Sequence, residues 1–256
     1  MKKDLSLTIA WLYPDLMSTY GDRGNVIVLQ KRSERRNIAV TVKSISVGAS
    51  QDELAECDLI FMGGAQDRQQ KIVSDDFSQG KSEALTKLIE NGTPGLYICG
   101  AYQFLGKYYK EADGTIINGL GILDLYTENP GDDKPRLIGN ILIESDLLAS
   151  ASLDTLVGFE NHGGRTYLGT EIKPLGKVIK GHGNNGSDHS EGAIYKNTFG
   201  SYLHGPILPK NPGFADLLIS LSLEKKYGEN IALSPLDDIA ELQAHNAIVT
   251  RLTGRV

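Results

Sequence analysis

Residues 95–105 read Gly-Leu-Tyr-Ile-Cys-Gly-Ala-Tyr-Gln-Phe-Leu. The apolar run at 96–98 predicts a short buried strand, and the small residues after Cys99 predict a turn that opens a helix. A strand, a tight turn and a helix in this order form a nucleophile elbow, which exposes one side chain above the sheet and aims the next backbone N–H groups at a developing oxyanion. The alternative is that Cys99 is a buried core cysteine, where free thiols usually lie.

Strands alternate with helices on both sides of this segment. Apolar or alternating runs predict strands at residues 5–12, 38–47, 58–64 and 95–100, and helical spacing predicts helices at 26–36 and 85–92. Residues 17–25 are polar and contain glycine, so they are predicted to form a loop. The alternation favours an α/β fold with a doubly wound, mostly parallel sheet and flanking helices.

The second half of the chain has a different pattern. Residues 119–204 predict mostly strands, at 121–126, 136–144, 157–161, 177–181, 192–195 and 199–203. Two helices are expected after them, at 214–221 and 236–252. Because no change in composition marks a linker, residues 1–256 are predicted to form one domain with a β-rich second half.

Charge and hydropathy limit the functional classes. The net charge is −6, with 26 basic and 32 acidic residues and no basic block, which argues against nucleic-acid binding. No apolar run approaches the ~20 residues of a membrane span, so no membrane insertion is expected. The N-terminus resembles a first strand rather than a signal peptide. We therefore expect a cytoplasmic protein whose two cysteines, Cys57 and Cys99, are reduced.

Two other segments carry polar groups suited to chemistry. Residues 200–206 read Gly-Ser-Tyr-Leu-His-Gly-Pro, so a strand ends in His204, which could act as general base for a nucleophile on a neighbouring strand. Residues 159–166 read Phe-Glu-Asn-His-Gly-Gly-Arg-Thr, and the paired glycines allow a ligand to approach the backbone closely. The plainer alternatives are a surface histidine in a turn and a simple hairpin.

These segments together resemble the class I (triad) glutamine amidotransferases, in the cobyric-acid-synthase-like branch. The resemblance rests on residues 99–103 (Cys-Gly-Ala-Tyr-Gln), 159–166 and 201–205. Further stretches resemble one subfamily, the glutaminase subunits of lipid II isoglutaminyl synthase, at 63–68 (Gly-Gly-Ala-Gln-Asp-Arg), 119–124 and 203–211. The resemblance runs from about residue 5 to the C-terminus and implies a flavodoxin-like class I amidotransferase fold.

The resemblance also implies a reaction and a role for each site residue. A Cys99 thiolate would attack the side-chain amide of L-glutamine to form a thioester, with His204 as the base. Backbone N–H groups at Gly64 and Gly100 would hold the oxyanion, and a guanidinium matches a substrate carboxylate in a bidentate manner. The substrate-binding residues would be Arg136, Gln103, Asn161, Gly163 and Gly164.

One departure from the family pattern concerns the third triad residue. Many triad amidotransferases carry a glutamate two positions after the histidine, whereas this chain has Ile207. The resemblance implies that a Mur-ligase-like partner subunit (MurT) in a heterodimer supplies an acid instead. If an acid of this chain completes the triad, Glu160 and Asp124 are the first candidates. The elbow also carries Tyr97 where glycine is frequent.

No cofactor or metal is expected in this chain. ATP and Mg²⁺ would belong to the partner, which would transfer the ammonia to the D-glutamate α-carboxylate of lipid II, giving D-isoglutamine. Residues 181–186 (Gly-His-Gly-Asn-Asn-Gly) fit a dinucleotide-binding pattern, but no apolar helix follows, so this interpretation is set aside. A stand-alone cysteine hydrolase or peptidase and a non-catalytic binding subunit remain alternative functions.

Overall fold

The computed structural model describes residues 4–65, 67–131, 133–148 and 154–254. Its centre is a six-stranded sheet in the order β13-β14-β4-β3-β1-β2. Five strands are parallel, and only the edge strand β13 runs antiparallel, against β14. The strand bounds are β1 Ser6–Leu12, β2 Ala39–Ile45, β3 Leu59–Met62, β4 Gly95–Ile98, β13 Ala193–Tyr195 and β14 Thr198–Ser201. The prediction of a mostly parallel sheet is therefore confirmed.

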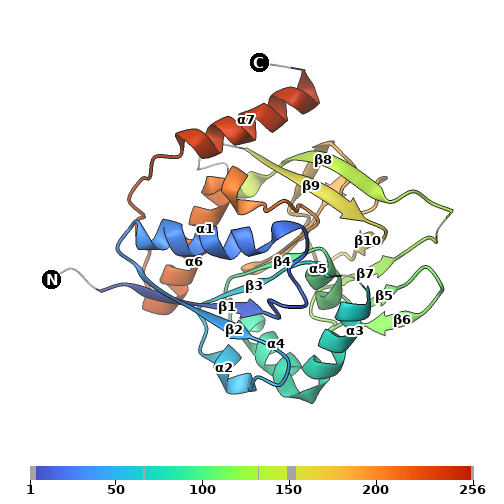
Figure 1. Cartoon of the computed structure of the whole chain (residues 1–256), viewed down its shortest axis with the longest axis horizontal. Coiled ribbons are helices and arrows are strands. Elements are labelled where there is room, and N and C mark those ends of the chain that lie inside the picture. The colour runs from blue at the N-terminus through green and yellow to red at the C-terminus, as the bar shows by residue number, and fades with distance from the viewer. Residues whose placement is uncertain (1–3, 66, 132, 149–153, 255–256) are drawn as a thin grey trace.

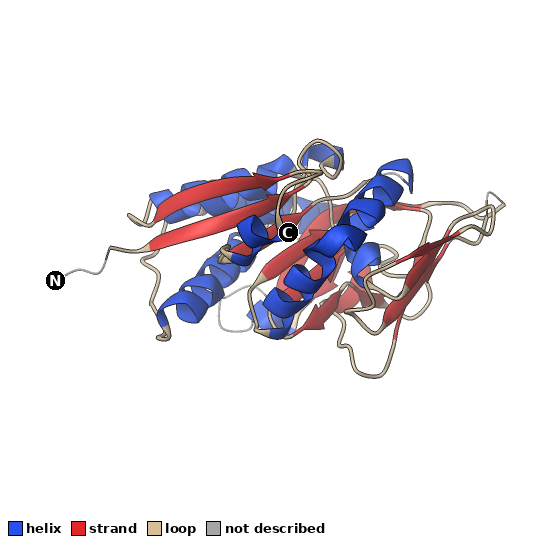
Figure 2. Cartoon of the chain, turned by 90° about the horizontal axis from the view of Figure 1, so that it is seen from below, coloured by secondary structure: helices blue, strands red, loops and turns tan. Residues whose placement is uncertain are grey.

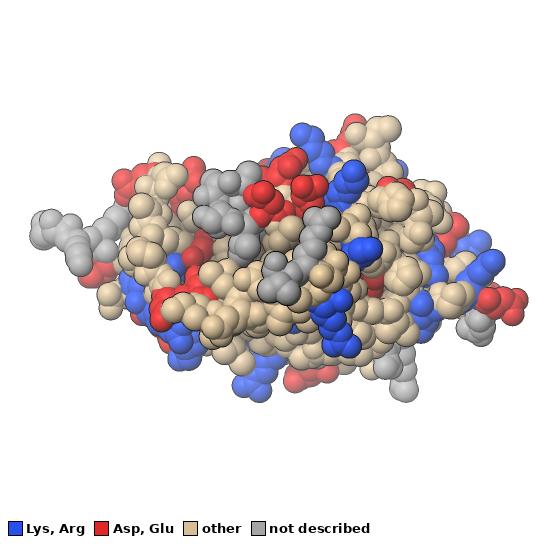
Figure 3. All heavy atoms as spheres, turned by 90° about the horizontal axis from the view of Figure 1, so that it is seen from above, with Lys and Arg blue, Asp and Glu red and all other residues tan. Residues whose placement is uncertain are grey.

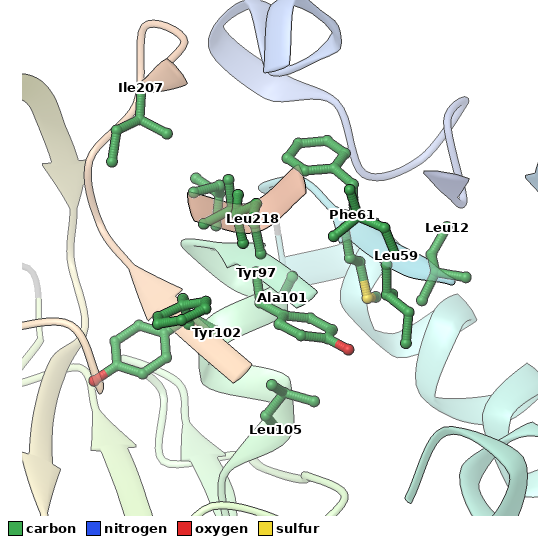
Figure 4. Close-up of a cluster of buried hydrophobic side chains, with 14 of the residues drawn as sticks. Leu12, Leu59, Phe61, Tyr97, Ala101, Tyr102, Leu105, Ile207 and Leu218 are labelled. Carbon is green, nitrogen blue, oxygen red and sulfur yellow. The ribbon is translucent and has the colours of Figure 1, made fainter. Parts of the chain in front are cut away.

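Helices cover this sheet on both faces (Figure 1). In that view α1 and α6 lie above the strands, whereas α2, α3 and α4 lie below them. The helix bounds are α1 Arg23–Glu34, α2 Gln51–Ala55, α3 Asp67–Asp76, α4 Ser82–Glu90, α5 Gly100–Leu105, α6 Pro212–Tyr227 and α7 Ile239–Thr253. Because both faces are covered, strands such as β3 and β4 are buried at every position. Figure 4 shows the resulting core, with Phe61 and Tyr97 from the sheet facing Leu105 and Leu218 from the helices.

Two smaller sheets form the β-rich second half. One has the order β10-β7-β5-β6 and the other the order β12-β11-β8-β9. Both Figure 1 and Figure 2 place the first of these sheets at the end of the molecule opposite the N-terminus. The bounds are β5 Tyr108–Lys110, β6 Ile116–Asn118, β7 Leu125–Glu128, β8 Leu137–Glu144, β9 Thr155–His162, β10 Arg165–Leu168, β11 Gly176–Lys180 and β12 Ser190–Glu191.

The structure corrects three local predictions. Helix α1 begins at Arg23, so the end of the predicted loop at 17–25 is helical. The strand expected at 121–126 starts later, at Leu125, because Gly121 adopts a left-handed conformation with φ +65°. Helix α3, which follows the Gly63-Gly64 turn, was not predicted, because its polar sequence contains only two apolar residues, Ile72 and Val73.

Charged side chains are mixed over the molecular surface. On the face in Figure 3, basic and acidic side chains alternate among the described residues, and no continuous basic stripe crosses it. In the part of the chain that the structure describes, no helix is long and apolar enough to cross a membrane.

Candidate active site

Cys99 lies at the turn between β4 and α5, as the elbow prediction requires. Its backbone has φ 52° and ψ −107°, a strained conformation for a residue with a side chain, and such strain is typical of functional sites. Its N–H donates to the carbonyl of Ser201 on the adjacent strand β14 at 2.8 Å. A Cβ on Gly100 would lie 2.8 Å from Nε2 of Gln70 and 3.1 Å from the nitrogen of Ala65. The residue after the nucleophile must therefore be glycine.

His204 follows β14, the strand beside β4, so the predicted neighbouring-strand arrangement is found. Its backbone is paired with Phe159, to which it donates a 2.7 Å hydrogen bond. The imidazole is fully buried, and Gly64 lies against both the imidazole and the nucleophile. A Cβ on Gly64 would lie 2.7 Å from Cε1 of His204 and 3.3 Å from Cβ of Cys99. The two side chains therefore converge over a position where no side chain fits.

The residue that orients His204 is Asp22, in the loop after β1. Its Oδ1 lies 3.3 Å from Nδ1 of His204, and both side chains are fully buried. The sequence left open whether the partner or this chain supplies such an acid, and the structure places Asp22, which was not among the candidates, at hydrogen-bond distance from His204. The sequence did not reveal Asp22 because this acid comes from a loop far from His204 in the chain. Position 207, where many related enzymes carry the acid, holds Ile207, a fully buried core side chain (Figure 4).

The two acids named as candidates from the sequence have other partners. Glu160 accepts hydrogen bonds from the backbone of His182 and Gly183, at 2.7 and 2.9 Å. Asp124, just before β7, pairs with Lys107, just before β5, at 2.5 Å. The Glu160 contacts also explain the glycine-rich loop at 181–186: its N–H groups bind a carboxylate of the protein itself, so they are not available to a phosphate.

Several groups act together on the protonation of His204. Burial by itself lowers the pKa of the imidazole, but attraction to a Cys99 thiolate and the pairing with Asp22 outweigh it and raise the pKa to about 10. The Nε2 atom has no hydrogen-bond partner among the described residues. With Nδ1 directed at Asp22, Nε2 is the nitrogen left to exchange a proton with the thiol.

The backbone donors for an oxyanion differ from the prediction in one respect. The N–H of Gly64 donates to Oδ2 of Asp22 at 2.7 Å, so it is already used. The next residue, Ala65, brings its backbone nitrogen against Gly100. Ala65 also lines the cleft that contains Cys99. The contribution of Gly64 is therefore its missing side chain, which leaves space for Cys99 and His204. Gln66 of the same motif lies outside the described residues.

A cleft of about 530 Å³ opens beside Cys99 and brings together all five of the predicted substrate-binding residues. Arg136, just before β8, donates from Nε to Oδ1 of Asn161 and from an Nη to its carbonyl, both at 3.0 Å. A Cβ on Gly163 would lie 3.2 Å from the other Nη of Arg136. The lining residues are Thr19, Tyr20, Ala65, Gln70, Cys99, Gln103, Tyr109, Asn129, Arg136, Asn161, His162, Gly163 and Gly164.

The Gln103 side chain is fixed in the cleft wall by two hydrogen bonds. Its Oε1 accepts from Nε2 of Gln70 at 3.2 Å, and its Nε2 donates to the hydroxyl of Tyr202 at 2.9 Å. A Cβ on Gly164 would come within 2.8 Å of that same Nε2. Gln103 therefore shapes the cleft beside the glycine turn. Gln70 and Tyr202, which support it, were not among the predicted residues.

Thr19, Tyr20 and Asp22 are the main omissions of the sequence analysis. All three belong to the loop after β1, and the elbow, the Gly63-Gly64 turn and His204 follow β4, β3 and β14. Ligands of open α/β sheets bind outside the carboxyl ends of the strands, so a polar loop after a predicted strand was the available signal.

Tyr97, which the sequence left unexplained, belongs to the core. Its ring is fully buried and lies over Gly95, where a Cβ would come within 2.6 Å of Cε2 of the ring. The elbow therefore tolerates a large residue two positions before the nucleophile because Gly95 gives it space.

Comparison with known proteins agrees with this geometry. Residues 8–212 match the model of the CobB/CobQ-like glutamine amidotransferase domain. The chain is 46% identical to the GatD subunit of lipid II isoglutaminyl synthase (glutamine-hydrolyzing) from Staphylococcus aureus, over 96% of both chains. It is 45% identical to the subunit of the same name from Streptococcus pneumoniae, over 91% of this chain and 86% of that one.

The fold is also found among solved structures. A crystal structure of a glutamine amidotransferase matches 83% of this chain and 98% of its own, with a TM-score of 0.57 and 13% identity. At that identity the likeness concerns the fold alone. The family match covers most of the chain and includes the elbow, the glycine turns and His204. The chain therefore belongs to the CobB/CobQ-like glutamine amidotransferase family.

Proposed function

We propose that this protein is the glutamine-hydrolysing subunit of a lipid II isoglutaminyl synthase. The observation that carries the proposal is the convergence of Cys99, His204 and Asp22 beside the 530 Å³ cleft. A strained nucleophile, a base and an orienting acid form the arrangement required for acyl transfer through a covalent intermediate. The high identity to the two GatD subunits supports glutamine as the acyl donor.

In the proposed reaction, Nε2 of His204 takes the Cys99 proton and the thiolate attacks the side-chain carbonyl carbon of glutamine. The backbone N–H groups of Gly100 and Ala65 stabilise the resulting oxyanion. The imidazolium protonates the departing nitrogen, the C–N bond breaks, and ammonia leaves a γ-glutamyl thioester. A water molecule, deprotonated by His204, then cleaves the thioester, giving glutamate and the free thiol.

Arg136 is the proposed ligand of the substrate α-carboxylate. The Nε atom and one Nη atom of Arg136 each donate a hydrogen bond to Asn161. The second hydrogen of that Nη and the hydrogens of the other Nη are left to form a bidentate pair with a carboxylate. Asn161 holds the guanidinium in place. Gly163 and Gly164 let the backbone pass close to Arg136 and Gln103, because a Cβ at either position would crowd those side chains. Gln103 completes this wall.

The proposed complex places ATP chemistry on another subunit. The relatives are named as subunits, which supports a partner, and a Mur-ligase-like protein (MurT) in a heterodimer fits the amidation of a peptide carboxylate. The ammonia would amidate the D-glutamate α-carboxylate of lipid II, and ATP and Mg²⁺ would bind the partner. A cytoplasmic location suits a reaction that needs a reduced cysteine.

Glutamate release from L-glutamine by the purified chain, with and without the co-purified Mur-ligase-like protein, tests the proposal. We expect hydrolysis by the chain alone, because Asp22 lies at hydrogen-bond distance from His204, and ATP-dependent amidation only in the complex. Cys99→Ala and Cys99→Ser should abolish hydrolysis while the melting temperature is retained. Glutamate production by a folded Cys99→Ala protein would contradict the proposal. Ammonia that is never transferred, even in the complex, would favour a stand-alone hydrolase.

A further inference from the structure

Tyr20 occupies an unusual position over the candidate active site. Its backbone lies in the left-handed region, at φ 54° and ψ 28°, which an aromatic residue rarely adopts. The ring meets the imidazole of His204 edge-on, with 5.0 Å between the centroids. About half of the Tyr20 side chain is exposed, at 51%, whereas His204 is fully buried. A partly exposed ring in a strained conformation therefore separates His204 from solvent.

A single hydrogen bond connects Tyr20 to the opposite wall of the cleft. The Asn161 side chain donates from Nδ2 to the Tyr20 hydroxyl at 2.9 Å. The remaining polar atoms of Asn161 are used by Arg136, which binds both its side-chain oxygen and its carbonyl. A continuous chain of contacts thus runs from Arg136 through Asn161 and Tyr20 to His204. It joins the proposed carboxylate ligand to the proposed base.

We propose that Tyr20 is a movable cover of the Cys99–His204 pair and that Asn161 latches this cover to Arg136. Strained backbone conformations cluster at switches, because a strained residue moves readily once its restraints are lost. The inference rests on the proposed function for its purpose: a cover fixed through Arg136 would close most firmly when glutamine orders that guanidinium. Tyr20 acts through His204 and Asn161 and is therefore a positioning residue.

The reactivity of Cys99 toward iodoacetamide measures the cover directly, without any need for glutaminase activity. Alkylation is followed by peptide mass spectrometry, which separates Cys99 from Cys57. Tyr20→Ala removes the ring and should raise the Cys99 rate by about tenfold or more. Tyr20→Phe keeps the ring but removes the hydroxyl that Asn161 binds. We expect it to raise the Cys99 alkylation rate by about fivefold, which corresponds to the loss of one ordinary hydrogen bond. Tyr167→Phe and Tyr167→Ala, at a tyrosine of β10 that is 38% exposed, are the matched controls and should leave the rate unchanged.

A double-mutant cycle tests the connection to Arg136. Arg136→Ala should speed alkylation in the wild-type background but add nothing when Tyr20→Phe is already present, because the latch is then broken. Equal Cys99 rates in the wild type and in Tyr20→Ala would overturn the cover. An undiminished effect of Arg136→Ala in the Tyr20→Phe background would overturn the latch. Neither result depends on glutamate release, so failure of the proposed function would be recognised separately.

Discussion

Nδ1 of His204 lies 3.3 Å from Oδ1 of Asp22, although the two residues are 182 positions apart in the chain. Asp22 also accepts the N–H of Gly64 through Oδ2, so one carboxylate fixes both the imidazole and the glycine turn beside it. This second contact helps to hold the carboxylate in place. The three triad residues and Gly64 therefore come from four loops at one edge of the parallel sheet.

Asp22→Asn should lower kcat for glutamine hydrolysis while the protein stays folded. Loss of the acid costs about 10⁴-fold in a serine protease, and we expect at least about 10²-fold here, because a thiol ionises more easily than a hydroxyl. Glutamate release by the isolated chain measures the effect. Asp124→Asn, at the surface pair with Lys107, is the control and should be neutral. Unchanged kcat in Asp22→Asn would mean that another group orients His204.

His204→Ala should lower kcat by about 10²-fold or more, the usual contribution of a general base. His162 provides the comparison, because it also lines the cleft. Its ring stacks on the ring of Tyr202, with 3.6 Å between the centroids, and its Nδ1 is hydrogen-bonded to the carbonyl of Gly164. Burial lowers the pKa of His162, so it is a neutral part of the wall. Steady-state kinetics of both alanine variants would decide: an equal loss of kcat in His162→Ala would reject His204 as the base.

Gly64→Ala should abolish hydrolysis, because the new methyl group would lie 2.7 Å from both Cε1 of His204 and Oγ1 of Thr19. The base would be pushed away from Cys99. Gly139→Ala on β8 is the matched control, since no atom lies within 4 Å of its Cβ position. Activity and the melting temperature of both variants should be compared. Normal turnover by Gly64→Ala would show that Cys99 and His204 need not meet over this residue.

Arg136→Ala should raise KM for glutamine by about 10- to 100-fold, the worth of a charged hydrogen-bonded pair. The melting temperature should hardly change, because the Arg136 side chain is exposed at the cleft mouth. Lys134→Ala, at a neighbouring exposed cation, controls for loss of charge. A large fall in thermal stability with normal kinetics would instead assign Arg136 a structural role.

Glu191 should make the stability of the protein depend on pH. Its carboxyl is fully buried, and burial raises its pKa to about 7, although it accepts hydrogen bonds from Ser201 and from the backbone of Tyr202. The folded state keeps a proton that the unfolded chain has lost, so this contribution to stability is present below pH 4.5 and disappears as the pH rises to about 7. Denaturant unfolding of Glu191→Gln should lack this loss, and an unaltered pH profile would contradict the prediction.

The sequence by itself determined the α/β architecture and singled out the two side chains that are proposed to react. Short apolar runs that end in small residues favour buried strands ending in tight turns, and this local rule located both Cys99 and the strand before His204. The paired glycines, Gly163 and Gly164, likewise indicated positions at which a side chain would not fit. These signals are local, because each depends on the conformation of a few consecutive residues.

Only the tertiary structure decided which acid lies against His204 and which aromatic ring packs on it. Asp22 and Tyr20 lie in a polar loop with no pattern of its own, and their roles depend on β1 and β14 ending at the same edge of the sheet. The same holds for Gly64, whose N–H was expected to face the substrate but binds Asp22. A hydrogen-bond partner is chosen by distance in three dimensions, and strand order, which fixes that distance, cannot be deduced from local sequence.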